Sequence, residues 1–347
     1  MNLCIKTYLP GLLLLLLFPF QGLNAQNGGF AGASSRTGFS PRGMAMANAY
    51  TATTSEGIYA YYNPALAATY TNSNQIDISV ASMEFDRIFQ TFGSTFQLPP
   101  SAGISFYILR SGIKDIDGRS LSGYPTGMFD VSEYQFAADF GIRMSEKLNV
   151  GIGFKFNYAD YHEDLSPGTT IGIDLGLLYH LSSYLNFGFT IQDLFATYKW
   201  NPDELYDLDQ SRNVENSFPV RYKWGLAFQK EKFSISGEYE IQAYSSEAEN
   251  SEVLVSDGQI SVYNSTETVK THSSMLRLGG AWYAHERLTL RGGYQVYDLG
   301  DIDSWGLSTG FSVNLPFDKF SPSIDYAFVM EPYRVSNMHV FALRLNL

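Results

Sequence analysis

The chain has 347 residues, a formal net charge of −12, and 24 tyrosines, 25 phenylalanines and 31 glycines. The acidic balance argues against a nucleic-acid-binding protein, because the phosphate backbone would repel it. Cys4 is the only cysteine, so the chain can form no internal disulfide, and a chain without its first 25 residues has no thiolate for a zinc site. Many aromatic residues and glycines, with no long apolar run after residue 25, favour a β-sheet protein.

The first 25 residues have the pattern of a secretory signal peptide. Lys6 supplies a positive charge, Leu9 to Phe20 is almost wholly apolar, and Leu23 to Ala25 fits a small-residue cleavage site. The alternative is a membrane anchor, which requires about 20 apolar residues, and this run is shorter. We therefore expect residues 1–25 to be removed during export, which leaves Gln26 at the N-terminus.

Residues 38–68 are the only long stretch after the signal peptide that does not have a strand pattern. Ser40-Pro41 and Asn63-Pro64 each place a capping side chain before a proline suited to the first helical turn. The pattern predicts two short helices joined by a tyrosine-rich connector. Helices of this length are unstable alone, so we expect the rest of the chain to enclose them.

From residue 75 onward, apolar and polar residues alternate with a period of two. In the run from Leu148 to Tyr158, Ile152 and Phe154 fall on one face and Lys155 on the other. We predict fourteen such strands, at 75–85, 87–98, 101–113, 131–144, 147–161, 169–182, 184–196, 218–230, 232–243, 271–285, 287–297, 304–316, 320–331 and 336–347.

The connections between these strands alternate between short and long from residue 99 onward. The longest are 114–130, 197–217 and 244–270. This alternation predicts an antiparallel up-and-down meander with all long loops at one end. The polar stretch 244–270 is expected to be a mobile loop.

Two architectures can bury such a meander: a soluble barrel with an apolar interior, or an outer-membrane barrel with an apolar exterior. The signal peptide, the even strand count and the one-sided loops favour the outer-membrane barrel. Closure also removes exposed strand edges. We therefore predict an all-β, 14-stranded antiparallel transmembrane β-barrel with a short helical N-terminal plug, in the outer membrane of a Gram-negative bacterium.

The polar face of the strands carries charges that this architecture places in the lumen. The lumen-facing charges are Asp139, Arg143, Lys155, Asp174, Arg221, Arg277, Arg291, Asp325 and Arg344. They can brace the barrel and anchor the plug, or line a conduction path, and we favour the first role. Arg42 is expected to pair with an inward carboxylate such as Asp139, Asp174 or Asp325.

No motif indicates catalysis or a metal site. His162-Glu163-Asp164 cannot converge from an extended strand end, and the acidic cluster 203–209 lacks the glycine and terminal glutamate of a calcium loop. No serine has the sequence context of a hydrolase nucleophile. We expect a non-enzymatic protein without a cofactor or metal.

Several motifs resemble those of the PorV/PorQ family of outer-membrane proteins and, more distantly, the FadL-type transporters of hydrophobic compounds. The plug motifs are Arg42-Gly43-Met44 and Tyr61-Tyr62-Asn63-Pro64-Ala65. Weaker matches are Phe218-Pro219-Val220-Arg221, Leu276 to Gly280, Leu290 to Tyr294 and Asp325 to Phe328. One departure is Ala47, where the family more often has glycine.

The resemblance implies a fourteen-stranded barrel (residues 73–347) with an N-terminal plug segment (residues 26–72) folded inward. PorV-like members are accessory components of type IX secretion. Our first hypothesis is therefore an accessory role in protein export or surface attachment, with secretion-machinery proteins or exported cargo as partners beside outer-membrane lipid, and the FadL-like role is the alternative. FadL-like members move hydrophobic small molecules, which implies an apolar pocket, and here its expected lining is Met44, Met46, Tyr59 and Tyr61. A third hypothesis, a surface adhesin, rests only on the long polar loops.

Overall fold

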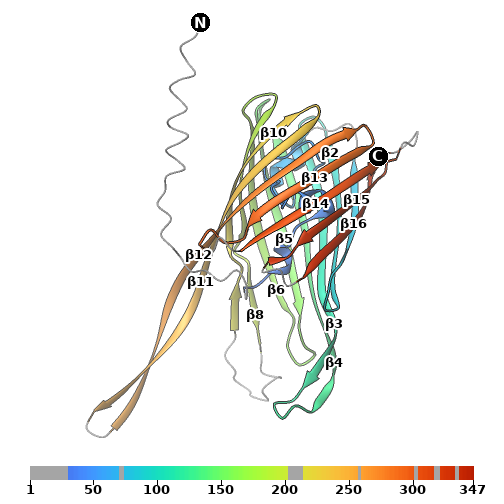
Figure 1. Cartoon of the computed structure of the whole chain (residues 1–347). Helices are drawn as coiled ribbons and strands as arrows, with labels where there is room; N and C mark the ends of the chain where they lie inside the picture. The colour runs from blue at the N-terminus through green and yellow to red at the C-terminus, as the bar shows by residue number, and fades with distance from the viewer. Residues whose placement is uncertain are drawn as a thin grey trace.

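The computed structural model describes residues 30–69, 74–201, 214–256, 259–300, 304–315, 321–332 and 336–347. Its main body is a closed antiparallel barrel of fourteen strands, in which strands adjacent in the chain are neighbours and the last pairs with the first. Figure 1 shows the tilted strands, running from blue-green to red along the chain. The predicted fold class is confirmed.

The barrel strands are β1 (Gln75–Ser82), β2 (Arg87–Leu98), β3 (Ala102–Arg119), β4 (Pro125–Arg143), β5 (Leu148–Asp160), β6 (Gly168–His180), β7 (Leu185–Leu194), β10 (Val220–Lys230), β11 (Phe233–Ser256), β12 (Gln259–His285), β13 (Leu288–Val296), β14 (Trp305–Asn314), β15 (Ser323–Met330) and β16 (Asn337–Asn346). Two further strands, β8 (Thr197–Trp200) and β9 (Val214–Ser217), form a separate small sheet.

Three predicted loops contain strands. The hairpins β3–β4 and β11–β12 continue through most of 114–130 and 244–270, so a mobile loop at 244–270 was the wrong prediction. The connection 197–217 contains β8 and β9. The physical reason is that alternation of apolar residues marks only the part of a strand that faces lipid. Beyond the membrane, backbone hydrogen bonds extend a hairpin without that pattern.

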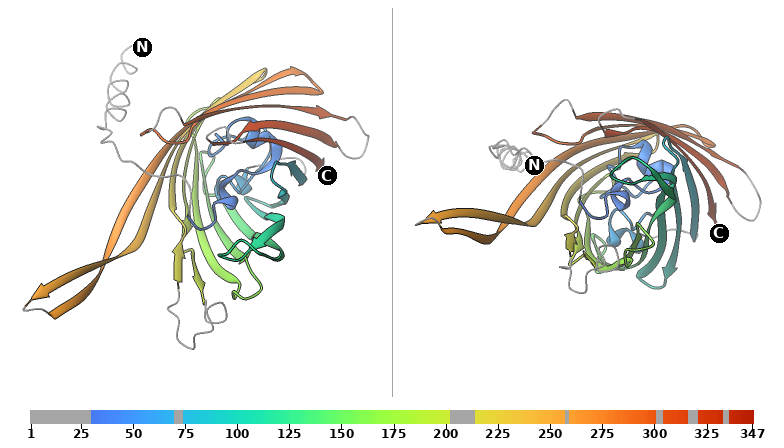
Figure 2. Two further views of the ribbon diagram at one scale, coloured as in Figure 1. Left: turned by 60° about the horizontal axis from the view of Figure 1, so that its bottom comes forward. Right: turned by 90° about the horizontal axis from the view of Figure 1, so that it is seen from below.

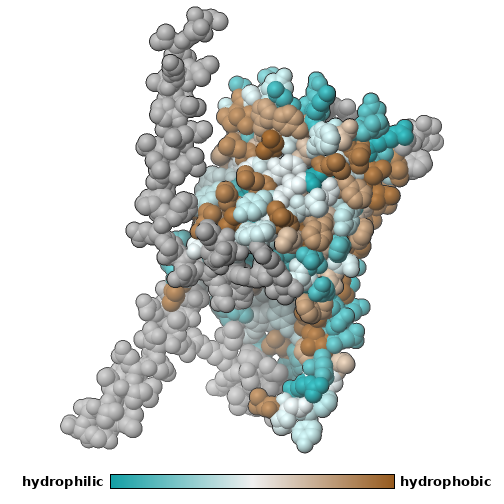
Figure 3. Space-filling view, in the orientation of Figure 1, coloured by the Kyte–Doolittle hydropathy of each residue, from teal (hydrophilic) through white to brown (hydrophobic). Residues whose placement is uncertain are grey.

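The two faces of the wall differ as an outer-membrane barrel requires. On β5, Phe154 and Phe156 point outward and are 52% and 44% exposed. Lys155 and Asn157, which alternate with them, are each 1% exposed. Figure 3 shows hydrophobic residues spread over the outer wall. An apolar exterior around a polar, charged interior is stable in a bilayer, and the barrel resides in the outer membrane.

Residues 30–69, which we call the plug, lie inside the barrel (Figure 2). They contain the short helices η1 (Ser34–Arg36), α2 (Ser40–Ala45) and η2 (Pro64–Ala68). Among the described residues, no helix is both long and apolar enough to span a membrane. The plug is therefore a short, mostly irregular insert enclosed by the strands.

The two proline-containing helix starts differ in their caps. The Asn63 side chain accepts a hydrogen bond from the Ala65 N–H at 3.0 Å and so caps η2 as expected. The predicted Ser40 cap is wrong, because Phe39 occupies the N-cap position of α2 without a side-chain cap. The Ser40 hydroxyl instead lies 2.8 Å from the hydroxyl of Tyr59, inside the plug.

The plug runs from one end of the barrel to the other. Phe30 stacks on Tyr244, where β11 begins to extend past β10 toward the projecting hairpin. The opposite end of the plug is close to the short turns, where Gln97 donates to the Thr69 carbonyl at 3.0 Å. The predicted signal peptide and the acidic cluster 203–209 lie outside the described residues, as does the proposed boundary at residue 72.

Candidate functional site

The interface between plug and wall is the candidate functional site, and glycines let the two approach closely. A Cβ added at any of eight inward positions would lie closer than 3.0 Å to a plug backbone atom or, at Gly310, to the Ala45 Cβ. We call these residues the glycine seat: Gly103, Gly141, Gly151, Gly176, Gly188, Gly279, Gly293 and Gly310. They lie on eight different strands, so the plug backbone touches the wall around most of its circumference.

Arg42 anchors α2 to the wall. Its Nε atom donates to Asp325 on β15 at 2.9 Å, and its Nη2 atom donates to the Ser323 hydroxyl at 2.7 Å. Asp325 is one of the three carboxylates expected as its partner. The Asp325 side chain is fully buried and that of Arg42 is 11% exposed, so solvent screens this ion pair little.

Glu56 is a second anchor. Its carboxylate lies 2.5 Å from the Arg291 guanidinium on β13, and its backbone carbonyl accepts from Arg42 at 3.2 Å and from Arg344 at 3.0 Å. Arg344 on β16 also pairs with Asp77 on β1 at 3.0 Å and donates to the Tyr59 hydroxyl. This network joins the plug to the seam where the first and last strands close the barrel.

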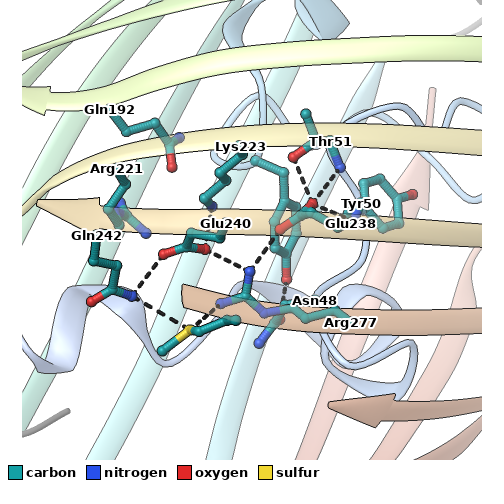
Figure 4. A network of polar contacts seen from close by, with 12 residues as sticks. Asn48, Tyr50, Thr51, Gln192, Arg221, Lys223, Glu238, Glu240, Gln242 and Arg277 are labelled. Carbon is teal, nitrogen blue, oxygen red and sulfur yellow. Dashed lines mark hydrogen bonds and ion pairs between the residues drawn. The ribbon is translucent and has the colours of Figure 1, made fainter. Parts of the chain in front are cut away.

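Glu238 on β11 holds the middle of the plug (Figure 4). One carboxylate oxygen accepts from the backbone N–H groups of Tyr50 and Thr51 and from the Thr51 hydroxyl, at 3.2, 3.1 and 2.6 Å. The other oxygen accepts from Arg277 on β12 at 2.7 Å. Because each oxygen has a donor, this buried carboxylate is well satisfied and fixes the plug backbone.

A third group of charges lies on the wall itself. Lys155 on β5 pairs with Asp174 at 2.6 Å and with Asp193 at 2.9 Å, and Arg221 on β10 pairs with Asp193 at 2.7 Å. All four side chains are at most 3% exposed. The lumen at this level is closed by ion pairs between neighbouring strands.

Sequence reasoning did not place Asp193 in the lumen. On β7 the inward residues have even numbers, such as Thr190 and Gln192, so strict alternation turns Asp193 outward. A bulge opposite Asp174 breaks the alternation, with a register shift between Ile173 and Leu175 and a φ of 63° at Asp193. The shift turns both Gln192 and Asp193 inward. No sequence pattern in β7 indicates this bulge.

The remaining predicted lumen charges occupy different environments. Arg277 lies between Glu238 and Glu240. Arg143 is at the end of β4, partly exposed, and donates to the Pro100 carbonyl at 3.3 Å. Asp139 is 1% exposed, and neither of its carboxylate oxygens has a hydrogen-bond partner among the described residues.

Apart from Arg42, the plug motif residues are buried and serve packing. A Cβ on Gly43 would overlap the Tyr62 ring. The Asn63 amide donates to the carbonyls of Thr51 and Leu177, at 2.8 and 3.0 Å, which ties the plug to β6. Pro64 begins η2 and rests against the glycine seat at Gly151.

One small cavity of about 10 Å³ lies between the plug and strands β1 to β3. Tyr59 and Tyr61 line it together with Phe39, Asp77 and Tyr107. A cavity of this volume holds about one water molecule. Met44 and Met46 do not line it, although both are fully buried. The apolar pocket expected to be lined by all four of these residues therefore stays a prediction.

At the end of the barrel with the projecting hairpins, the start of the plug lies beneath aromatic residues. Glu133 on β4 accepts hydrogen bonds from the Ser34 and Tyr161 hydroxyls. Burial, together with the Glu133 carboxylate, raises the pKa of Tyr161, so its hydroxyl stays protonated and donates. Tyr161 stacks on Trp200 of β8, with ring centroids 5.0 Å apart.

Comparisons with known proteins show similarity in fold only. No family model matches the sequence, and no curated protein is similar to it. The toluene transporter TodX of Pseudomonas putida matches 89% of this chain over 96% of its own, at 12% identity and a TM-score of 0.57. The monoaromatic hydrocarbon channel CymD matches 89% of this chain over 97% of its own length, at 14% identity and a TM-score of 0.57. A FadL homologue of Pseudomonas aeruginosa matches 88% of this chain over 96% of its own length, at 11% identity and a TM-score of 0.55.

These structures are transport barrels, and their similarity extends over nearly the whole chain, so the fold is that of FadL-like outer-membrane barrels. The resemblance to the PorV/PorQ family has no support from a matching family model and stays a prediction.

Proposed function

We propose that this protein is an outer-membrane channel for small hydrophobic molecules. The observation that carries the proposal is the combination of a full-length fold match to hydrocarbon channels with an inward-folded plug that occupies the lumen. This function was the alternative among the two transport roles expected from the sequence, and it now has the stronger support.

The plug inside the lumen argues against an open diffusion pore. Plug residues contact the wall at the glycine seat, and the cavity between them holds about one water molecule. A water-filled channel needs a continuous polar path of much larger cross-section. Passage of any solute therefore requires movement of part of the plug, which is compatible with a selective channel rather than a general porin.

Uptake measurements test the proposal. Cells that lack their own channels for apolar solutes would express this chain and receive radiolabelled toluene or a radiolabelled long-chain fatty acid. Expression is expected to raise the initial uptake rate of at least one apolar solute but not of a labelled disaccharide. Equal rates with and without expression for every apolar solute, at verified levels of folded barrel, would contradict the proposal.

One feature favours the other role, an accessory component of protein export. The β11–β12 hairpin pairs from Phe233 with Trp282 to Ser256 with Gln259, whereas its neighbours β10 and β13 pair only as far as Ala243 and Leu276. The remaining ribbon extends past the barrel with unpaired edges, which suits contact with another protein. A pull-down from solubilised outer membrane tests this role. If the chain has this role, secretion components or exported cargo should co-purify with the intact chain and not with a chain that lacks residues 246–268.

A further inference from the structure

Asp139 is a buried carboxylate without a partner. It lies on the inward face of β4, is 1% exposed, and neither oxygen accepts a hydrogen bond from any described residue. A carboxylate removed from water without compensation costs several kcal/mol, and the cost rises with the charge it carries. The neighbouring charges do not supply the compensation, since no described cation lies within ion-pairing distance of Asp139 while Lys155 and Arg221 already serve Asp174 and Asp193.

The wall is shaped around this carboxylate. In the strand register, Asp139 faces Ser105 on β3 and Gly153 on β5, and Gly153 in turn faces Asp174 on β6. One carboxylate oxygen of Asp139 lies where a Cβ of residue 153 would stand, and the Asp174 Cβ is 3.3 Å from the same point. The glycine therefore leaves room for two carboxylates to approach each other across β5.

A second unpartnered oxygen lies beside them. Tyr107 on β3 is diagonal to Asp139 in the register, since its own partner is Ala137. Its ring is 2% exposed, and its buried hydroxyl has no hydrogen-bond partner among the described residues. Two residues with buried, unsatisfied oxygens, one a carboxylate and one a phenol, therefore occupy diagonal positions on neighbouring strands.

We propose that Asp139 and Tyr107, with Asp174 at the edge, form a binding site for a monovalent alkali cation between the plug and strands β3 to β6. Hard cations take oxygen ligands, and a single positive charge satisfies the carboxylate that the ion-pair cluster leaves uncompensated. Among the described residues no three His, Cys, Asp or Glu side chains are arranged to hold a metal ion, which argues against a divalent ion in a carboxylate cage.

The bound cation would brace β4 against β3 and β6 beside the plug. Tyr107 packs on the plug residues Phe39 and Tyr61, with ring centroids 5.5 and 5.6 Å away. Occupancy of the site therefore bears on how firmly the plug is seated, in addition to the stability of the wall.

Thermal unfolding of the purified full chain in detergent tests the site. The midpoint would be measured in NaCl, KCl, RbCl and choline chloride at equal ionic strength. For the native chain, at least one alkali salt is expected to raise the midpoint above that in choline by roughly 3 °C. Asp139→Asn should remove this difference, whereas Asp117→Asn, which alters an exposed carboxylate on the β3–β4 hairpin, should keep it.

A crystallographic measurement gives an independent readout that does not depend on a variant folding. Crystals of the native chain in thallous acetate should show an anomalous peak within coordination distance of the Asp139 carboxylate. Equal midpoints in all four salts, or a salt dependence that survives in Asp139→Asn, would overturn the proposal. So would the absence of an anomalous peak. Equal stability of Asp139→Asn and the native chain in every salt would identify the occupant as a proton.

Discussion

Arg42 in the plug and Asp325 in β15 form a buried ion pair with 2.9 Å between Nε and Oδ2, although 283 positions separate them in the sequence. The pair links α2 of the plug to the second-last strand of the wall. It joins the plug to the wall and does not link one wall strand to another, so it reports on plug seating rather than on strand pairing.

Replacement of Arg42 by alanine should loosen the plug and leave the barrel closed. The change leaves the buried Asp325 carboxylate without its cationic partner. Removal of one partner of a buried ion pair typically lowers the folding stability by about 3–5 kcal/mol. Limited proteolysis should then cleave within 30–69, while the unheated protein keeps the fast SDS–PAGE mobility of a folded barrel.

Arg119 provides the matched control for this substitution. It pairs with Asp117 on the exposed part of the β3–β4 hairpin, where an ion pair contributes about 0–1 kcal/mol. Arg119→Ala should therefore leave the proteolysis pattern of the plug unchanged. If Arg42→Ala prevents barrel assembly altogether, the plug is part of the folding nucleus and not an insert that seats late.

Adjacent glycines on β13 allow a direct test of the glycine seat. A Cβ at Gly293 would overlap the Ala47 backbone nitrogen, whereas a Cβ at Gly292 would meet nothing within 4 Å. Gly293→Ala should destabilise the folded protein by about 1–3 kcal/mol through overpacking, as measured by urea unfolding in detergent micelles. Gly292→Ala should be close to neutral, and equal losses for the two variants would mean that the plug does not press on the wall there.

Ala47 is predicted to be a strained position that glycine relieves. Its φ of 53° lies in the left-handed region, which costs a residue with a Cβ about 1 kcal/mol. Ala47→Gly should therefore raise the unfolding free energy by up to about 1 kcal/mol. Ala45→Gly, at the last residue of α2, should lower it by about 0.5–1 kcal/mol because glycine is a poorer helix former than alanine.

The orientation of the barrel predicts which turns are reachable from outside the cell. Ser122 lies on the exposed tip of the β3–β4 hairpin, and Glu146 lies on a short turn at the other end. With Cys4 replaced by serine, a membrane-impermeant maleimide on intact cells should label Ser122→Cys and spare Glu146→Cys. Labelling of Glu146→Cys but not of Ser122→Cys would show that the barrel has the opposite orientation in the membrane.

The sequence alone determined the strand content and the character of the two wall faces. The alternation around Lys155 marks one face for lipid and one for the lumen, because a bilayer demands apolar contact along the whole crossing. Strand ends near the membrane were placed within a few residues on the same basis, and β2 was placed without error. The inward position of charges such as Arg221 and Arg344 follows from the same period of two.

Only the tertiary structure decided which of these charges meet, and where the pattern breaks. A bulge turns Asp193 inward to join Lys155 and Arg221, and the plug brings Glu56 to Arg291, contacts that depend on registers across distant strands. Likewise, the parts of the β3–β4 and β11–β12 hairpins beyond the membrane have no apolar alternation from which their strands could be predicted. The unpartnered state of Asp139 is also a tertiary fact, because a sequence records which residues carry charge but not which of them are left without a neighbour.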